Sequence, residues 1–416
     1  MSNLLDKASI VTTPTAYDNG KILSVKPTDG TGDFDFTRNS SATRVNSQGL
    51  IEDITSNLPR IDYTGGEGHW LFEPQSTNLV QYSSDFTPSR WVKNNTLNSN
   101  IAISPSGLLD ASKITCTTNG YNYIFNNFAP PSGNYTNSIF LKKDASSGWV
   151  ALRIWAGGGA NGVSVWFDLD NSEIGTSSSN VAGFTLTNAT SEYFGNDWYR
   201  LSVSGTTDSS SYLSLNFVDG DGLNTYTNVS GKSCFIWGAQ SEVQTYATSI
   251  IPTSGSTITR LQDAAFGAGS SDLINSTEGV LYAEISIDTT LGVGSDITLI
   301  DSSNTADFIR FTNDGGTNKV NMYFRYNGVS NFHTFIGDTT IFKKYAIQWG
   351  NGEVNYYVNG VLKETDFTTM PTLNVFDKLH LSRTGSSNRA FTGKVKALAV
   401  FKEALTDAEL TCLTTI

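Results

Sequence analysis

Residues 354–364 read Val-Asn-Tyr-Tyr-Val-Asn-Gly-Val-Leu-Lys-Glu, and this stretch decides the fold class of the region around it. Two runs rich in β-branched and aromatic residues flank the pair Asn359-Gly360. Both residues of the pair tolerate positive φ angles, so they predict a type I′ turn between antiparallel strands. The stretch therefore predicts a β-hairpin in an antiparallel β domain.

Alternating strands extend this pattern on both sides of the hairpin. Apolar and polar residues alternate in 280–287 and again in 320–326, as expected for half-buried strands. A last strand is predicted at 393–401. It is followed by Thr406-Asp407-Ala408-Glu409, a capping box that predicts a short helix from about Asp407 to Leu413.

Four segments of this region resemble concanavalin A-like (laminin G-like) domains. They are Tyr345 to Trp349, the Tyr-Val-Asn-Gly hairpin at 357–360, Gly393 to Phe401, and Ala404 to Leu410. The resemblance covers about 275–416 and implies an antiparallel β-sandwich. Lectins, adhesins, hydrolases and inert spacers all use that fold, so the resemblance does not by itself imply a function.

The chain from about 82 to 259 also predicts one strand after another, without helical periodicity of useful length. Alternation in 149–155 places Trp149, Arg153 and Trp155 on one strand face, opposite Val150, Leu152 and Ile154. This spacing of short strands is typical of an antiparallel sandwich. Further strands are predicted at 138–142, 163–169, 197–203, 211–217 and 234–240.

The N-terminal region contains three motifs that resemble a leader of bacteriophage fibre and spike proteins. They are Thr37 to Asn46 with Gly49 to Glu52, then Pro59 to Tyr63, then Leu71 to Leu79. The resemblance covers about 34–92 and implies a virion component. Three later segments resemble the central sandwich of such fibres, a module similar to jelly-roll carbohydrate-binding modules: 198–200, 237–240 and 246–260.

We therefore expect an all-β chain with two antiparallel β-sandwich domains after an N-terminal attachment region, and a short C-terminal helix. The expected parts are a leader at 1–80, a jelly-roll sandwich at 81–262 and a concanavalin A-like sandwich at 275–416. The Ser-, Gly- and Pro-rich segment 250–257 indicates a linker or domain edge.

Composition argues against two kinds of partner. The 416 residues have a net charge of −12 and only 16% charged residues, and Lys and Arg do not cluster, so no nucleic-acid partner is expected. The longest apolar runs are too short to span a membrane. Three widely spaced cysteines and an N-terminus without an apolar signal segment fit a virion protein made in a reducing cytoplasm. A bacterial protein exported by another route fits these features as well.

The sequence predicts a protein that is not an enzyme and that has no cofactor. Three histidines lie far apart, and no hydrolase or phosphate-binding motif is present. Glu284 and Asp288 lack the E-x-D-x-E pattern of concanavalin A-like glucanases. No metal site is expected, because Asp219-Gly220-Asp221-Gly222 is more simply a turn than a calcium loop. A carboxylate pair that meets only in space remains an alternative.

Sugar binding would use aromatic rings stacked on pyranose faces, beside hydrogen-bonding side chains. The strand face with Trp149, Arg153 and Trp155 is one candidate, although such tryptophans are more often part of a core. The C-terminal region offers Tyr323 and Arg325, with the same ambiguity. His333 and Arg383 are expected in loops at 327–333 and 383–389, where binding residues often lie.

Four charged residues of the leader are candidates for virion attachment or assembly: Arg38, Arg44, Arg60 and Glu73. They form either a network between subunits or a solvated surface. Since buried charges must be paired, their position beside strand-like apolar residues favours pairing.

Our first hypothesis is a structural fibre or spike protein of a bacteriophage virion. Its N-terminal third would hold a homotrimer together and bind other virion proteins, and its sandwiches would contact glycans of the host surface. A glycan depolymerase on the same scaffold is the second hypothesis. A decoration protein of the virion without a receptor is the third.

Overall fold

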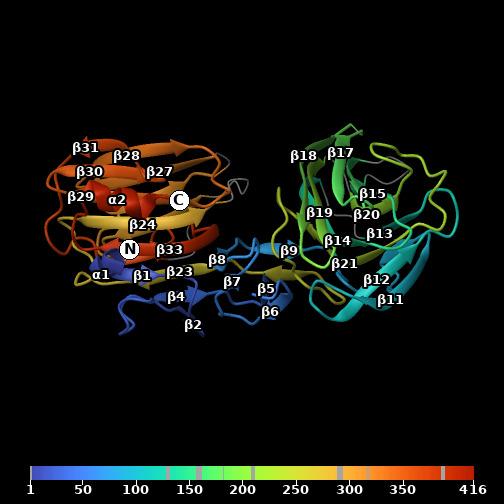
Figure 1. Ribbon diagram of the computed structural model, residues 1–416, viewed down its shortest axis with the longest axis horizontal. Helices are drawn as coiled ribbons and strands as arrows, with labels where there is room; N and C mark the ends of the chain where they lie inside the picture. Colours follow the sequence, from blue (N-terminus) through green and yellow to red (C-terminus); the bar gives the residue numbers. More distant parts are fainter. Residues whose placement is uncertain are drawn as a thin grey trace. The chain divides into compact units, whose positions relative to one another are not determined.

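The computed structural model describes residues 2–127, 132–155, 162–180, 182–207, 211–287, 294–315, 318–385 and 389–416. It consists almost entirely of antiparallel strands, which confirms the predicted all-β class (Figure 1). The helices of the described residues are α1 (Ser2–Lys7) and α2 (Asp407–Thr414). Neither is long and apolar enough to cross a membrane.

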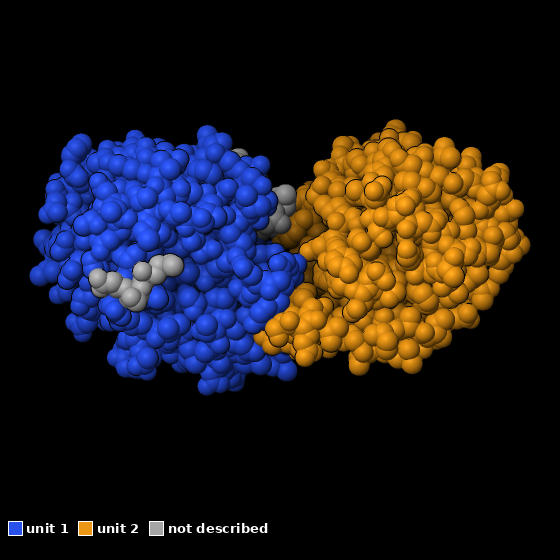
Figure 2. Space-filling model, in the orientation of Figure 1, with its two compact units in different colours: residues 1–41, 54–75, 261–416 blue, residues 42–53, 76–260 orange. Residues whose placement is uncertain are grey.

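The chain forms two compact units, and each is assembled from separate stretches of sequence (Figure 2). Unit 1 contains residues 1–41, 54–75 and 261–416, and unit 2 contains 42–53 and 76–260. These limits differ from the expected ones, because residues 1–80 do not form a region of their own. Residues 8–12, 35–37 and 70–72 pair with strands more than 220 residues away.

One sheet of unit 1, called the β24 sheet, includes strands from both ends of the chain. Its strand order is β31 (Val361–Phe367), β30 (Glu353–Val358), β29 (Lys343–Gly350), β24 (Gly279–Ser286), β33 (Gly393–Phe401), β8 (His69–Phe72) and β7 (Ile61–Asp62). Strand β1 (Ala8–Thr12) also pairs with β33.

The second sheet of unit 1, called the β26 sheet, has the same mixed origin. Its order is β2 (Tyr17–Asp18), β3 (Lys21–Ile22), β4 (Phe34–Thr37), β23 (Ala264–Ala268), β32 (Lys378–Leu381), β25 (Ser295–Ile300), β26 (Phe308–Asn313), β27 (Lys319–Tyr326) and β28 (Val329–Ile336).

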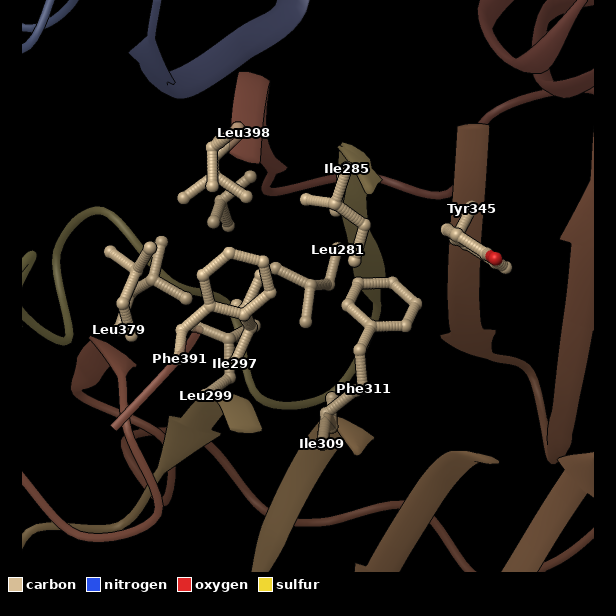
Figure 3. Packing of buried hydrophobic residues seen from close by; sticks show 14 of the residues in the cluster. Leu281, Ile285, Ile297, Leu299, Ile309, Phe311, Tyr345, Leu379, Phe391 and Leu398 are labelled. Atoms are coloured by element: carbon tan, nitrogen blue, oxygen red, sulfur yellow. The ribbon is translucent and has the colours of Figure 1, made fainter. Parts of the chain in front are cut away.

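The core of unit 1 lies between these two sheets. Figure 3 shows Leu281, Ile285 and Leu398 of the β24 sheet packed with residues of the β26 sheet that include Ile297, Phe311 and Leu379. N-terminal residues such as Phe34, Phe36, Trp70 and Phe72 belong to the same core. Burial of these large side chains explains why the early strands join the late ones.

Unit 2 is a sandwich of two further sheets around its own core. The β15 sheet has the order β10 (Trp91–Lys93), β13 (Tyr123–Asn126), β20 (Tyr212–Phe217), β15 (Trp149–Trp155), β16 (Val163–Asp168) and β17 (Glu173–Ser179). The β14 sheet has the order β11 (Thr96–Ile103), β12 (Leu109–Thr115), β21 (Ser233–Glu242), β14 (Gly133–Lys143), β19 (Trp198–Thr207) and β18 (Phe184–Tyr193). Two short pairs are β5 (Ala42–Val45) with β6 (Ile51–Ile54), and β9 (Ser76–Asn78) with β22 (Ile258–Arg260).

Two local predictions match the structure closely. Asn359 and Gly360 have φ angles of 50° and 78°, and they join β30 to β31 as the predicted hairpin. At the C-terminus, the side chain of Thr406 accepts a hydrogen bond from the backbone of Glu409, whose carboxylate accepts one from the backbone of Thr406. This capping box starts α2, which packs against β29 and β30 (Figure 1).

One local prediction is wrong. The segment 327–333 is not a binding loop, because Asn327 and Gly328 form a tight turn with φ angles of 50° and 81°, and β28 follows at once. The same Asn-Gly signal that identified the 359–360 hairpin is present here. The other predicted loop, 383–389, includes residues 386–388, which lie outside the described residues.

Candidate glycan-binding surfaces

The outer face of the β15 sheet carries the aromatic residues that the sequence singled out. Val150, Leu152 and Ile154 point into the core of unit 2, so the alternate residues of β15 point outward. Trp149 packs beside a small cluster that contains Ala151, Trp166 and Val218. The glycines 157–159, which follow β15 in the sequence, lie outside the described residues.

Trp155 belongs to a group of rings that we call the aromatic cluster: Tyr121, Tyr123, Phe125, Trp155, Tyr212 and Tyr226. The ring centroids of Phe125 and Trp155 are 4.9 Å apart, and those of Trp155 and Tyr212 are 5.7 Å apart. Tyr123 and Trp155 stack with an interplanar angle of 29°. All six rings are partly exposed, so the cluster presents an aromatic surface.

Arg153 lies beside this cluster and is fully buried. Its Nη2 atom donates to Oδ1 of Asn224 at 2.7 Å. Its Nε and Nη1 atoms, and Nε1 of Trp155, have no partner of good hydrogen-bond geometry among the described residues. A buried donor without a partner costs about 1–3 kcal/mol. The arrangement therefore favours a polar ligand, or water, that can accept hydrogen bonds.

The hydroxyl of Tyr121 adds a further donor to this face. Burial raises the pKa of Tyr121, while the neighbouring Arg153 acts in the opposite direction. The phenol therefore stays protonated near neutral pH and can donate. Asn216 on β20 interacts with the same hydroxyl, but its Nδ2 atom makes no hydrogen bond of good geometry among the described residues.

In unit 1, the outer face of the β26 sheet brings together Tyr323, Arg325 and Arg383. Ile309, Phe311, Val320, Met322 and Phe324 fill the core, so the alternate residues of β26 and β27 point outward. Tyr323 stacks on Phe332 with centroids 5.0 Å apart. Arg383 donates from Nε to the buried carboxylate of Asp296 at 2.7 Å.

His333 does not join this surface. On β28 it is paired with Met322, whose side chain points into the core, so the two side chains share that inner side of the sheet. There it stacks on the buried ring of Tyr356, and its Nδ1 lies 2.8 Å from Oε2 of Glu364. The sequence could not show on which face of the sheet the His333 side chain lies, because this depends on the register of β28 with β27.

Three of the four charged leader residues lie in the interior of unit 1. Arg60 contacts Glu73 at 2.7 Å and also Asp263, and Arg38 contacts Asp263 at 3.0 Å. Both guanidinium side chains are fully buried. We call this the leader network. Asp263 was not predicted as a member, because it lies 190 residues after Glu73.

Arg44 is the fourth leader residue, and it belongs to unit 2. Its guanidinium contacts Glu52 at 2.7 Å near the surface. The charged partners of all four leader residues therefore lie within the chain. Of the four leader residues, Arg44 is the one exposed enough to contact another chain directly, because Arg38, Arg60 and most of Glu73 are buried.

A cavity of about 510 Å³ in unit 2 is lined by carboxylates and one tryptophan. Glu52, Asp85 and Asp110 are among its lining residues, and Nε1 of Trp237 donates to Asp110 at 3.1 Å. Burial acts to raise the pKa of Glu52, but hydrogen bonds from Asn46 and Arg44 hold it below its usual value. A lowered pKa keeps this carboxyl ionised and unable to act as a general acid near neutral pH.

The acidic turn at 219–222 is occupied by hydrogen bonds within the chain. Asp219 accepts from the backbone of Thr227 and Asn228, and Asp221 accepts from Thr176. Within the described ranges, no group of three His, Cys, Asp or Glu residues could hold a metal ion.

Residues 287–411 match the model of the concanavalin A-like lectin/glucanases superfamily. This match covers the C-terminal part of unit 1 and under half of the chain. It agrees with the predicted resemblance of that region. Comparison with curated proteins gave no match.

Several solved structures are distantly similar. The CBM40 module of a Ruminococcus gnavus IT-sialidase, bound to α2,3-sialyllactose, is 17% identical with a TM-score of 0.28, covering 33% of this chain and 83% of that one. A Bacillus licheniformis β-glucanase is 19% identical with a TM-score of 0.26, covering 35% and 73%. Domains LG4-5 of mouse laminin α1 are 12% identical with a TM-score of 0.24, covering 70% and 90%. Scores this low support no functional argument.

Proposed function

We propose that this protein binds glycans through the aromatic cluster of unit 2 and acts as an attachment protein. The observation behind this proposal is the buried Arg153, whose Nε and Nη1 donors have no partner of good geometry among the described residues, beside six partly exposed rings. Binding sites usually combine an apolar surface with a few fixed polar groups. A sugar ring fits both parts, because it has an apolar face and a rim of hydroxyl acceptors.

Trp155→Ala tests this proposal directly. Loss of the central ring should weaken binding of the best ligand in a glycan panel at least tenfold, about 1.4 kcal/mol. The matched control is Tyr193→Ala, which removes a ring that is 60% exposed on the β14 sheet. Equal affinity of both variants, measured by calorimetry or fluorescence titration, would exclude the aromatic cluster as the binding surface.

We further propose that binding occurs without cleavage. The carboxylates of the 510 Å³ cavity are the strongest support for a depolymerase, but Glu52, with its lowered pKa, is unsuited to proton donation. Incubation with the bound glycan should release no reducing ends. If ends are released and Asp110→Asn stops their release, the depolymerase hypothesis replaces this one.

The bacteriophage part of the proposal rests on the leader motifs alone. We propose that the protein is a homotrimeric virion fibre, and light scattering of the full chain at micromolar concentration tests the trimer. A monomer would contradict it. Truncation before Thr77 is not a clean test of attachment, because it removes β1, β4, β7 and β8 from unit 1. Arg44→Ala at the surface of unit 2 is the better variant.

A further inference from the structure

Four arginines gather on and beside the outer face of the β26 sheet. Arg310 on β26 is paired with Tyr323 on β27, which is paired with Phe332 on β28. The adjacent row pairs Phe308 with Arg325. Arg383 and Arg389 come from the segment after β32, and both contact Asp296 on β25. We call these four residues the arginine cluster.

The carboxylates near the arginine cluster do not balance its charge. Asp296 is fully buried and accepts from Arg383 at 2.7 Å and from Arg389 at 3.1 Å. Asp314 pairs with Arg389 at 3.0 Å. Both carboxylates are therefore engaged by the same two arginines, Arg383 and Arg389.

Arg310 and Arg325 have no carboxylate partner among the described residues. Arg310 is 6% exposed and donates only to neutral acceptors, Oγ1 of Thr298 at 3.0 Å and the carbonyl of Arg383 at 3.4 Å. Arg325 makes no hydrogen bond within the described ranges, and its Nε atom is buried. Both guanidinium groups lie over the ring of Phe308, at 3.7 Å and 6.0 Å from its centroid.

This excess of positive charge is held at an energetic cost. Burial, together with the neighbouring Arg383, Arg389 and Arg325, lowers the pKa of Arg310 to about 10 against the opposing effect of Asp296. The net charge of the whole chain is −12, so the positive charge of the arginine cluster is a local feature and not a general property of the surface. An anion bound between Arg310 and Arg325 would compensate this positive charge and remove its energetic cost.

We propose that the arginine cluster binds an anionic group of a glycan, a carboxylate or a sulfate, as a second site that deepens the proposed glycan-binding function. Arg310 and Arg325 contact the anion. The stacked pair of Tyr323 and Phe332, of which Phe332 is 50% exposed, supports the apolar face of the sugar. The ligand class is therefore an acidic polysaccharide.

The test uses the full chain and three polymers: heparin as the sulfated probe, polygalacturonate as the carboxylated probe, and dextran as the neutral one. Arg325→Ala is the main variant, because Arg325 makes no described hydrogen bond whose loss would disturb the fold. Arg310→Lys keeps the charge but loses the planar fork. The control is Lys363→Ala, which removes one positive charge from β31 in the other sheet of unit 1.

We expect the wild type and Lys363→Ala to bind at least one acidic polymer with an affinity that falls as salt increases. Arg325→Ala should weaken this binding at least tenfold, and Arg310→Lys should weaken it as well. Comparison of the affinities for heparin and for polygalacturonate shows whether the site prefers a sulfate or a carboxylate. The wild-type melting temperature should rise with the bound polymer, and that of Arg325→Ala should not.

Three outcomes would overturn the inference. One is equal affinity of the wild type and both arginine variants for the acidic polymers. Another is no binding of either polymer. The third is stronger, equally arginine-dependent binding of a single-stranded DNA oligonucleotide, which would make this a nucleic-acid surface. The proposed function fails separately: it is contradicted when Trp155→Ala leaves the binding of neutral glycans intact, whatever happens to acidic polymers at the arginine cluster.

Discussion

The leader network and the arginine cluster are both groups of arginines in unit 1, but they differ in their carboxylates. In the leader network, burial acts to lower the pKa of Arg60, and the charges of Asp263 and Glu73 outweigh it and raise that pKa. In the arginine cluster, burial and neighbouring arginines prevail, and the pKa of Arg310 falls to about 10. Compensated arginines stabilise the fold, and uncompensated ones are available to a ligand.

Removing the shared carboxylate of the leader network should have the largest effect. Asp263→Asn removes the carboxylate that the buried Arg38 and Arg60 both contact, so we expect a loss of about 3–5 kcal/mol in the free energy of unfolding. Urea denaturation measures it. Asp314→Asn is the control, because its carboxylate is 51% exposed and its pair with Arg389 should contribute less than about 1 kcal/mol. Equal losses of stability in both variants would show that burial of the carboxylate does not decide how much an ion pair contributes in the two clusters.

Acidification should give the next largest effect, again confined to unit 1. Burial lowers the pKa of His69 and of His380 to about 4 in the folded state, against an ordinary value of 6.5. A depressed histidine pKa means that the unfolded chain binds the proton more tightly, so stability falls as pH drops from about 6.5 toward 4. The three histidines of the sequence, His69, His333 and His380, all belong to unit 1.

Calorimetry at pH 7, 5.5 and 4.5 measures this effect, with His380→Gln as the comparison. The melting transition of unit 1 should move down with pH, and the variant should show a shallower dependence. A transition of unit 1 that does not change between pH 7 and 4.5 would contradict the burial of these neutral rings.

Arg310→Met should have a small effect of the opposite sign. The substitution removes a buried charge that has no carboxylate partner, so the free energy of unfolding should stay the same or rise by about 1 kcal/mol. Arg38→Met in the leader network is the matched comparison, and it should destabilise because it leaves Asp263 with one partner fewer. Two variants that destabilise equally would remove the distinction between compensated and uncompensated arginines.

Arg325→Ala should have the smallest effect on stability, within about 0.5 kcal/mol. Its guanidinium makes no hydrogen bond in the described part of the chain, and its side chain is partly exposed. Thermal melting without ligand measures the change. A large loss would indicate that Arg325 is a structural residue and that its contact with Phe308 stabilises the sheet.

Local patterns were sufficient to predict much of the fold. Alternation in 149–155, the Asn359-Gly360 turn and the capping box at Thr406 each depend on residues close in sequence, and the structure shows all three. The pairing of β8 with β33 and of β4 with β23 depends on partners 220 or more residues apart. Such register is fixed by burial in a shared core, which a single sequence does not display.

The candidate sites were predictable in part for the same reason. Alternation correctly placed Arg153 with Trp155 on one face, but the aromatic cluster also needs Phe125 and Tyr212 from other strands. Arg310 was missed because it lies between Ile309 and Phe311 in a strand that no binding motif marks. Only the register of β26 with β27 shows that it lies beside Tyr323 and near Arg325.

The interleaving of the two units has a consequence for synthesis on the ribosome. Strands β1, β4 and β8 emerge early, but their partners β23 and β33 are translated only after residue 263. Unit 2 is complete in the nascent chain at Arg260 and can fold cotranslationally, whereas the first strands of unit 1 wait with unpaired edges. During that interval, a longer nascent chain on the same messenger RNA can present its own β23 and β33 to these early strands. Strand exchange between copies would therefore begin on the polysome.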